Sequence, residues 1–162
     1  MLDQLKELLE MQRVLDENIL NAKGITEYPL ENMKIALFVE LGELMNEFPT
    51  KFKHWKSSAV DNREKGLVEF VDCLHFALSI TNEKVDFEKC KRFMKNYWEL
   101  NSGWDTFDLL YEILYDLYEE VYADLISDLF RVGNRLGFTW EEIYNAYKEK
   151  NKVNYERLKN GY

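Results

Sequence analysis

Four acidic residues in two separate segments are the strongest candidates for chemistry. Glu40 and Glu43 lie three residues apart, and so do Glu69 and Asp72. Residues with this spacing share one face of a helix, so each pair would project its carboxylates together. If the two helices packed antiparallel, all four carboxylates would meet in one space and raise each other's pKa values. A hard divalent cation such as Mg²⁺ removes this repulsion and prefers oxygen ligands, so the spacing predicts a metal site.

The segment that carries the second pair is apolar on nearly all sides. Between positions 70 and 80 its polar residues are Asp72, His75 and Ser79, spaced three and four apart. A narrow polar stripe on such a helix predicts that the stripe faces the protein interior. The first acid pair could instead belong to a solvated helix face, because Glu47 extends its stripe, but the inward-facing second pair favours a site.

Other kinds of site fit the sequence poorly. A ferritin-like di-iron centre needs two Glu-x-x-His motifs, and the segment from Asp72 to His75 only approximates one of them. A zinc site is disfavoured because there are two histidines, no HExxH motif and no paired cysteines. The sequence also lacks a Walker A motif and GxGxxG, so phosphate groups would have to be bound in another way.

A basic segment near the C-terminus is a candidate for phosphate binding. Positions 147–159 hold five basic residues against two acidic ones. Lys150 and Arg157 lie two helical turns apart and share a face with Asn154. Such a pair can clamp phosphate oxygens, and Arg can bind two of them at once. A basic helix end that complements the helix macrodipole would look the same, so both interpretations stay open.

Gln12 stands where the first helix should have an apolar residue. The apolar positions of that segment recur at three and four, and Gln12 completes the series. A buried Gln must satisfy both its amide N–H groups and its carbonyl. The edge of a nucleobase could do this, and so could a structural hydrogen bond inside the bundle. The spacing does not decide between the two.

The elements that would position these residues are helices. The chain has 162 residues with only two Pro and seven Gly, and its apolar residues recur at three and four rather than at two. Thr139 followed by Glu142 is a capping box that marks a helix start. We therefore expect a single all-α domain over 1–162, a bundle of five or six helices. The predicted helices cover 2–22, 30–48, 64–81, 86–99, 106–136 and 139–157.

The predicted helix 106–136 is long for a chain of this size. Its length of about 30 residues would span about 45 Å, so it either breaks or supports a subunit interface. Tyr111, Tyr115, Tyr118 and Tyr122 follow helical spacing along it. Such a stripe favours a core or dimer seam over a stacking platform.

Charge and hydropathy exclude several kinds of partner. The net charge is −9, which disfavours direct binding to nucleic acid or an anionic membrane. There is no signal-peptide pattern and no apolar run of about 18 residues. We therefore expect a cytoplasmic protein.

Taken together, these motifs resemble those of the dimeric, all-α dUTP pyrophosphatases (dUTPases), a family within the all-α nucleoside triphosphate pyrophosphatases. The acid quartet matches the wider superfamily, while the C-terminal motif together with Gln12 and Trp55 narrows the match to dUTPases. The similarity extends over nearly the whole chain. The matching stretches are 11–16, 40–47 running into 52–55, 69–76 and 147–157.

The resemblance implies a role for each of nine residues. In that family, acidic residues hold Mg²⁺ ions that grip the triphosphate, basic residues bind phosphate oxygens, and polar or aromatic residues surround the uracil nucleoside. Carried over position by position, the metal ligands are Glu40, Glu43, Glu69 and Asp72, the phosphate ligands are Lys150 and Arg157, and the nucleoside contacts are Gln12, Trp55 and Asn154.

The implied reaction is the hydrolysis of dUTP by water attack on the β-phosphorus. Its products are dUMP and pyrophosphate, dUDP can also be a substrate, and the activity keeps uracil out of DNA. The resemblance also implies a homodimer. We take Glu43 as the base that accepts the proton of the attacking water. Two alternatives remain: the same chemistry on another nucleotide such as dCTP, and a non-catalytic helical interaction module.

Overall fold

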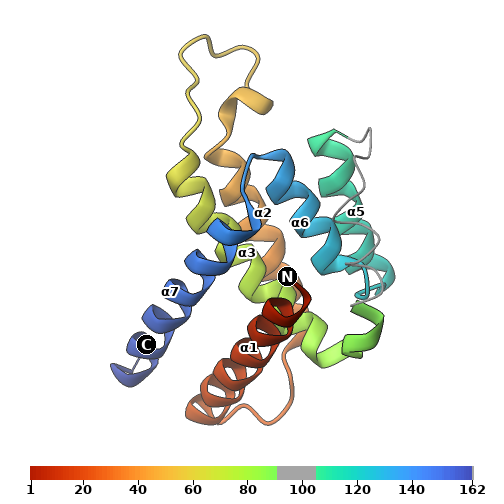
Figure 1. The fold of residues 1–162 in the computed structure, drawn as a ribbon, viewed down its shortest axis with the longest axis vertical. Coiled ribbons are helices and arrows are strands. Elements are labelled where there is room, and N and C mark those ends of the chain that lie inside the picture. The colour runs from red at the N-terminus through yellow and green to blue at the C-terminus, as the bar shows by residue number, and fades with distance from the viewer. Residues whose placement is uncertain (91–104, 162) are drawn as a thin grey trace.

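The computed structural model describes residues 1–90 and 105–161, and all regular structure in these ranges is helical. The predicted all-α class is confirmed. Of the predicted helix 86–99, residues 87–90 are helical and the remainder lies outside the described residues. The described elements are α1 (Leu2–Lys23), α2 (Leu30–Asn46), the short 3₁₀ helix η1 (Pro49–Lys51), α3 (Arg63–Lys84), α5 (Thr106–Glu119), α6 (Leu125–Arg135) and α7 (Trp140–Lys159) (Figure 1).

Helix α3 is the centre of the bundle. It contacts α1, α2, α6 and α7, and half of its residues are buried, including Phe70, Leu74 and Leu78. Burial on nearly all sides explains why its sequence is apolar all round. Helices α2 and α3 run antiparallel and are joined through η1 and a loop that projects beyond the bundle (Figure 1). This packing brings the two acid pairs onto facing helices.

The segment predicted as one helix over 106–136 forms two helices, so it breaks, which is one of the two outcomes that its length indicated. Helix α5 ends at Glu119, Glu120 takes a left-handed conformation with φ of 61°, and α6 begins at Leu125. Glu has no special preference for positive φ, so the break is imposed by tertiary packing. Folding back lets α5 and α6 pack on each other and bury the apolar residues of both, which one long rod could not do.

The tyrosine stripe of this segment is divided between surface and core. Tyr111, Tyr115 and Tyr118 are exposed, whereas Tyr122, which follows the break, is buried. The prediction of a core role is therefore wrong for Tyr111, Tyr115 and Tyr118 within one chain. Together with the exposed Phe107 they leave one face of α5 aromatic and open.

The start of α7 is tied to the start of α3. Thr139 and Glu142 form the predicted capping box. Arg63, the first residue of α3, donates hydrogen bonds to Glu142 Oε2 at 2.8 Å and to the Gly137 carbonyl at 2.7 Å. Arg63 and the Thr139 backbone N–H lower the pKa of Glu142 to about 2, so the pair stays charged at any ordinary pH. This link sets α7, with its basic residues, alongside the acidic stripe of α3.

Candidate active site

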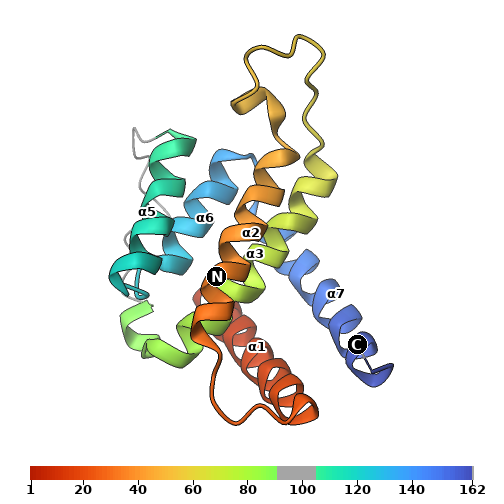
Figure 2. The ribbon, with the colours of Figure 1, turned by 180° about the vertical axis from the view of Figure 1, so that it is seen from behind.

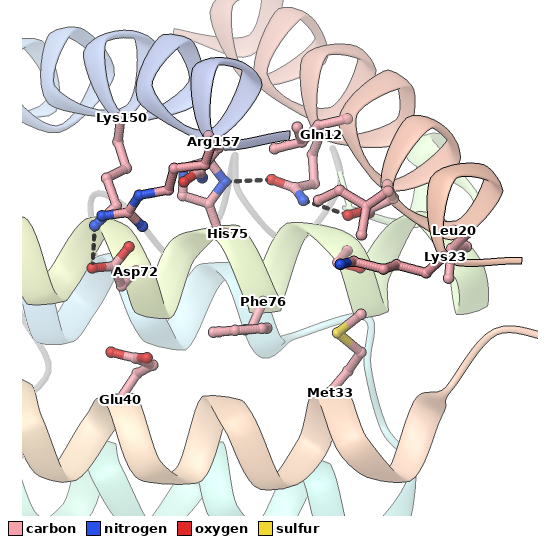
Figure 3. Close-up of a pocket in the computed structure, with 15 residues that line it drawn as sticks. Gln12, Leu20, Lys23, Met33, Glu40, Asp72, His75, Phe76, Lys150 and Arg157 are labelled. Carbon is pink, nitrogen blue, oxygen red and sulfur yellow. Dashed lines mark hydrogen bonds and ion pairs between the residues drawn. The ribbon is translucent and has the colours of Figure 1, made fainter. Parts of the chain in front are cut away.

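A cavity of about 460 Å³ lies among α1, α2, α3 and α7. Figure 3 shows that its two ends differ in character. Glu40, Asp72 and Lys150 lie at one end, Met33, Leu20 and Lys23 lie at the other, and Phe76 lies between them. The residues predicted from sequence that line it are Gln12, Glu40, Asp72, Lys150, Asn154 and Arg157.

Three of the four predicted acids converge beside the charged end. Single carboxylate oxygens of Glu40, Glu43 and Glu69 all lie within 4.8 Å of one another. The first two come from α2 and the third from α3, as the antiparallel packing of these helices requires. Asp72 lies one turn further along α3, where its Oδ2 is 2.6 Å from Lys150 Nζ.

The charges of this acid cluster act on one another. Burial raises the pKa of Glu40 to about 7, with further increases from Asp72, Glu43 and Glu69. Burial also raises the pKa of Glu69, and the nearby Asp72 and Glu43 add to the effect. The four carboxylates therefore share one electrostatic environment, and holding all of them ionised is unfavourable without a compensating cation.

The donor set suits a hard divalent cation. Every converging atom is a carboxylate oxygen, which Mg²⁺ prefers and zinc or iron would not select over nitrogen or sulfur. His75, the histidine that lines the cavity, is buried, and its Nδ1 is hydrogen-bonded to Gln12. The residues present thus fit a hard cation such as Mg²⁺ better than zinc or iron.

Helix α7 supplies the positive side of the cavity. Lys150, Asn154 and Arg157 line it together, which is the shared face predicted from their spacing. Lys150 reaches across to Asp72 on α3, and both side chains are only about one-fifth exposed. Arg157 lies near this pair in Figure 3. Positive groups on one helix therefore stand opposite negative groups on two others.

Gln12 is buried and fully engaged on its carbonyl side. Its Oε1 accepts hydrogen bonds from the Tyr147 hydroxyl at 2.8 Å and from His75 Nδ1 at 2.6 Å. Its Nε2 donates to Asp16 Oδ1 at 2.7 Å. Gln12 thus makes structural hydrogen bonds inside the bundle, which was one interpretation of its position. It also lines the cavity, as the second interpretation, a contact to a nucleobase, would require.

Trp55 lies apart from the cavity. It is 69% exposed in the loop between η1 and α3, where its ring stands edge-on to His54. That loop projects beyond the α2 and α3 ends in both views of the bundle (Figure 2). A role for Trp55 in the uracil pocket remains a prediction.

The structure adds cavity residues that sequence reasoning did not single out as ligands. Asp16, one turn after Gln12 on α1, lines the cavity, and burial raises its pKa to about 6. Phe76 provides an aromatic ring between the two ends. The i, i+4 spacing from Gln12 was a usable signal for Asp16. His75 and Ser79 also line the cavity, in agreement with the inward-facing stripe predicted for α3.

Comparison with known proteins identifies the family. No described helix is long and apolar enough to cross a membrane. No curated protein matches the chain. The sequence model of the family described as dUTPase matches residues 4–162, almost the whole chain, and the described fold is all-helical as this family requires. The chain therefore belongs to the dimeric, all-α dUTPase family and is a dUTP diphosphatase.

Proposed function

We propose that the protein hydrolyses dUTP to dUMP and pyrophosphate in this cavity, in a reaction that depends on Mg²⁺. The observation that carries the proposal is the meeting of an acid cluster with Lys150 and Arg157 in one cavity that is also lined by Phe76, Met33 and Leu20. A nucleoside triphosphate likewise combines charged phosphates with a planar base that can pack against such side chains. The experiment is pyrophosphate release from dUTP with Mg²⁺ and with EDTA, and turnover that survives EDTA would contradict the metal requirement.

Glu40, Glu43, Glu69 and Asp72 would hold the metal. Bound Mg²⁺ would neutralise the triphosphate and make nearby water more acidic. The pKa values of Glu40 and Glu69 are raised in part by the neighbouring carboxylates, which repel one another when ionised. A cation at this position would relieve that repulsion. Asp72 would exchange its ion pair with Lys150 for the metal, which releases Lys150 for phosphate.

The remaining steps belong to side chains of this protein. Glu43 is the exposed member of the converging acids, so water can reach its carboxylate. It accepts the proton as the water attacks the β-phosphorus, and the bond from that phosphorus to the bridging oxygen breaks so that dUMP leaves. Lys150 and Arg157 bind the phosphate oxygens and stabilise the negative charge that develops on them. Gln12 and Asn154 contact the nucleoside, and Trp55 contributes only if its loop closes over the base.

The pH dependence of metal binding tests the acid cluster. The pKa of Glu40 is raised in the folded protein, so its contribution to stability is complete below its usual pKa near 4.5 and is lost as the pH rises through about 7. Mg²⁺ competes with protons for these oxygens. We therefore expect Mg²⁺ to raise the melting temperature more at pH 8 than at pH 5.5. In Glu40→Gln, the rise in melting temperature caused by Mg²⁺ should differ less between the two pH values. If Mg²⁺ raises the melting temperature of the wild-type protein equally at both pH values, the proposed metal site is contradicted.

We also propose that the protein is a homodimer whose seam lies on α2 and α5. An apolar groove is lined by residues of these two helices, including Phe38, Val39 and Leu114, and the exposed Tyr111 and Tyr115 stand on α5. Large exposed apolar faces mark interaction surfaces. Sedimentation should give twice the chain mass of 19.5 kDa. A monomer at micromolar concentration would contradict the seam.

Two narrower proposals accompany this function. The family match from 4 to 162, the packing of α1, α2, α6 and α7 on α3, and the packing of α5 on α6 and α2 support one domain over the whole chain. A cytoplasmic location is supported by the substrate, which is a free nucleotide.

Two alternative functions have distinct outcomes in a turnover assay. Turnover of dCTP in place of dUTP would favour the same chemistry on another nucleotide, and a folded protein inert on all nucleotides would favour a non-catalytic interaction module.

A further inference from the structure

The amide of Gln12 is held in one orientation by groups on three helices. Tyr147 on α7 and His75 on α3 both donate to Oε1, and a carbonyl oxygen has two lone pairs, so its acceptor capacity is used up. One N–H of Nε2 is donated to Asp16 on α1. The second N–H is the one polar hydrogen that Gln12 has left for a ligand. Gln12 therefore offers a donor to the cavity and no acceptor.

His75 can play this part in only one form. Oε1 is solely an acceptor, so Nδ1 must carry the hydrogen of the neutral ring, and the buried Nε2 has no hydrogen-bond partner among the described residues. Burial lowers the pKa of His75 to about 3, so the ring stays neutral at physiological pH. The ring also stacks on Tyr147, with centroids 4.3 Å apart. Each donor to Gln12 is thus held in place by the other.

The acceptor beside this donor is Asp16. Its carboxylate lines the cavity one turn after Gln12 (Figure 3 shows the dashed bond from the Gln12 amide). The two residues together present a donor next to an acceptor. On the side of its 4-position, uracil carries the O4 carbonyl next to N3–H, which is the complementary order of acceptor and donor. On the same side cytosine carries the N4 amino group next to an N3 lone pair, which reverses that order and leaves both pairs mismatched.

We propose that His75 and Tyr147 are positioning residues that fix the polarity of a base-reading pair formed by Gln12 and Asp16, and so select uracil over cytosine. This inference rests on the proposed function, because it assigns the base to the same cavity. Neither positioning residue needs to touch the substrate. Their effect is to prevent the Gln12 amide from turning its carbonyl toward the base.

The first test is a pair of Tyr→Phe variants on the same helix. Tyr147→Phe removes the hydroxyl that binds Gln12 and keeps the ring that stacks on His75. We expect KM for dUTP to increase about tenfold, because one hydrogen bond is lost, while kcat changes little. We also expect the ratio of kcat/KM for dUTP to kcat/KM for dCTP to fall. Tyr144→Phe is the control, because its hydroxyl binds only the exposed Glu7 and Lys148, and it should leave both constants unchanged.

The second test uses His75 and does not depend on Tyr147→Phe folding well. His75→Leu removes the Nδ1–H donor, whereas His75→Asn places an amide N–H near the same point. His75→Leu should raise KM for dUTP and lower the ratio of kcat/KM for dUTP to kcat/KM for dCTP. His75→Asn should bring both KM and this ratio most of the way back to the wild-type values. The proposal is overturned if a folded Tyr147→Phe protein keeps the wild-type KM and ratio, or if the two His75 variants behave alike.

These outcomes are separate from failure of the proposed function. If the wild-type protein does not turn over dUTP at all, the function itself is wrong, whatever the variants do. If the wild-type protein prefers dUTP to dCTP and the variants keep that preference, only the positioning role is wrong.

Discussion

Replacing Glu43 with Gln should lower kcat for dUTP hydrolysis by about 10³-fold or more, since a positioned general base contributes on that order. The substitution keeps the size of the side chain but removes the group that accepts the proton of the attacking water. Glu43 is the exposed member of the three converging acids, so it is the one that bulk water can reach. Binding of a non-hydrolysable dUTP analogue should remain measurable, because Lys150, Arg157 and the nucleoside contacts are untouched.

Glu47→Gln is the matched control for this variant. Glu47 lies one turn beyond Glu43, directly after α2, and is outside the group of converging acids. The same change of charge there should leave kcat within a fewfold of the wild-type value. If Glu43→Gln and Glu47→Gln have similar kcat values, Glu43 does not act as the base.

Replacing Lys150 with Met should raise KM for dUTP by about 10- to 100-fold, as expected for losing one hydrogen bond to a charged group. Met keeps most of the aliphatic stem, so the packing of α7 should survive. Lys150 contacts one of the four proposed metal ligands directly, with its Nζ 2.6 Å from Asp72 Oδ2. Steady-state kinetics with saturating Mg²⁺ separates this effect from weaker metal binding.

Lys152→Met provides the comparison for Lys150. Lys152 is two residues further along α7, is exposed, and pairs only with Glu149 on the same helix. Its removal should leave KM unchanged, because it faces away from the cavity. Equal KM values for the two variants would show that general positive charge on α7, and no particular contact, attracts the triphosphate.

The helical architecture was predictable because apolar spacing and capping residues are local signals. The Thr139–Glu142 capping box marks the start of α7 in both sequence and structure. The length of the segment indicated that a break was possible, but its position at Glu120 was not predictable, because the residue has no preference for positive φ and the apolar spacing continues through it. Tertiary packing of α5 against α6 overrides a sequence that is locally compatible with one long helix.

The candidate site was predictable to the extent that it follows helix faces. Three of the four acids converge, and Lys150, Asn154 and Arg157 share a face, as their spacing indicated. The hydrogen bonds around Gln12 join α1, α3 and α7, and no spacing within one helix reveals partners on another. Trp55 lies in an irregular loop, where periodicity gives no information about direction.

The most direct test of the central claim is pyrophosphate release from a panel of dUTP, dTTP, dCTP, dATP, dGTP and UTP in the presence of Mg²⁺. The account predicts turnover confined to dUTP, with dUMP and pyrophosphate formed in equal amounts and none formed when EDTA replaces Mg²⁺. Turnover of dCTP at a rate comparable to dUTP, or release of inorganic phosphate with dUDP as the product, would contradict it.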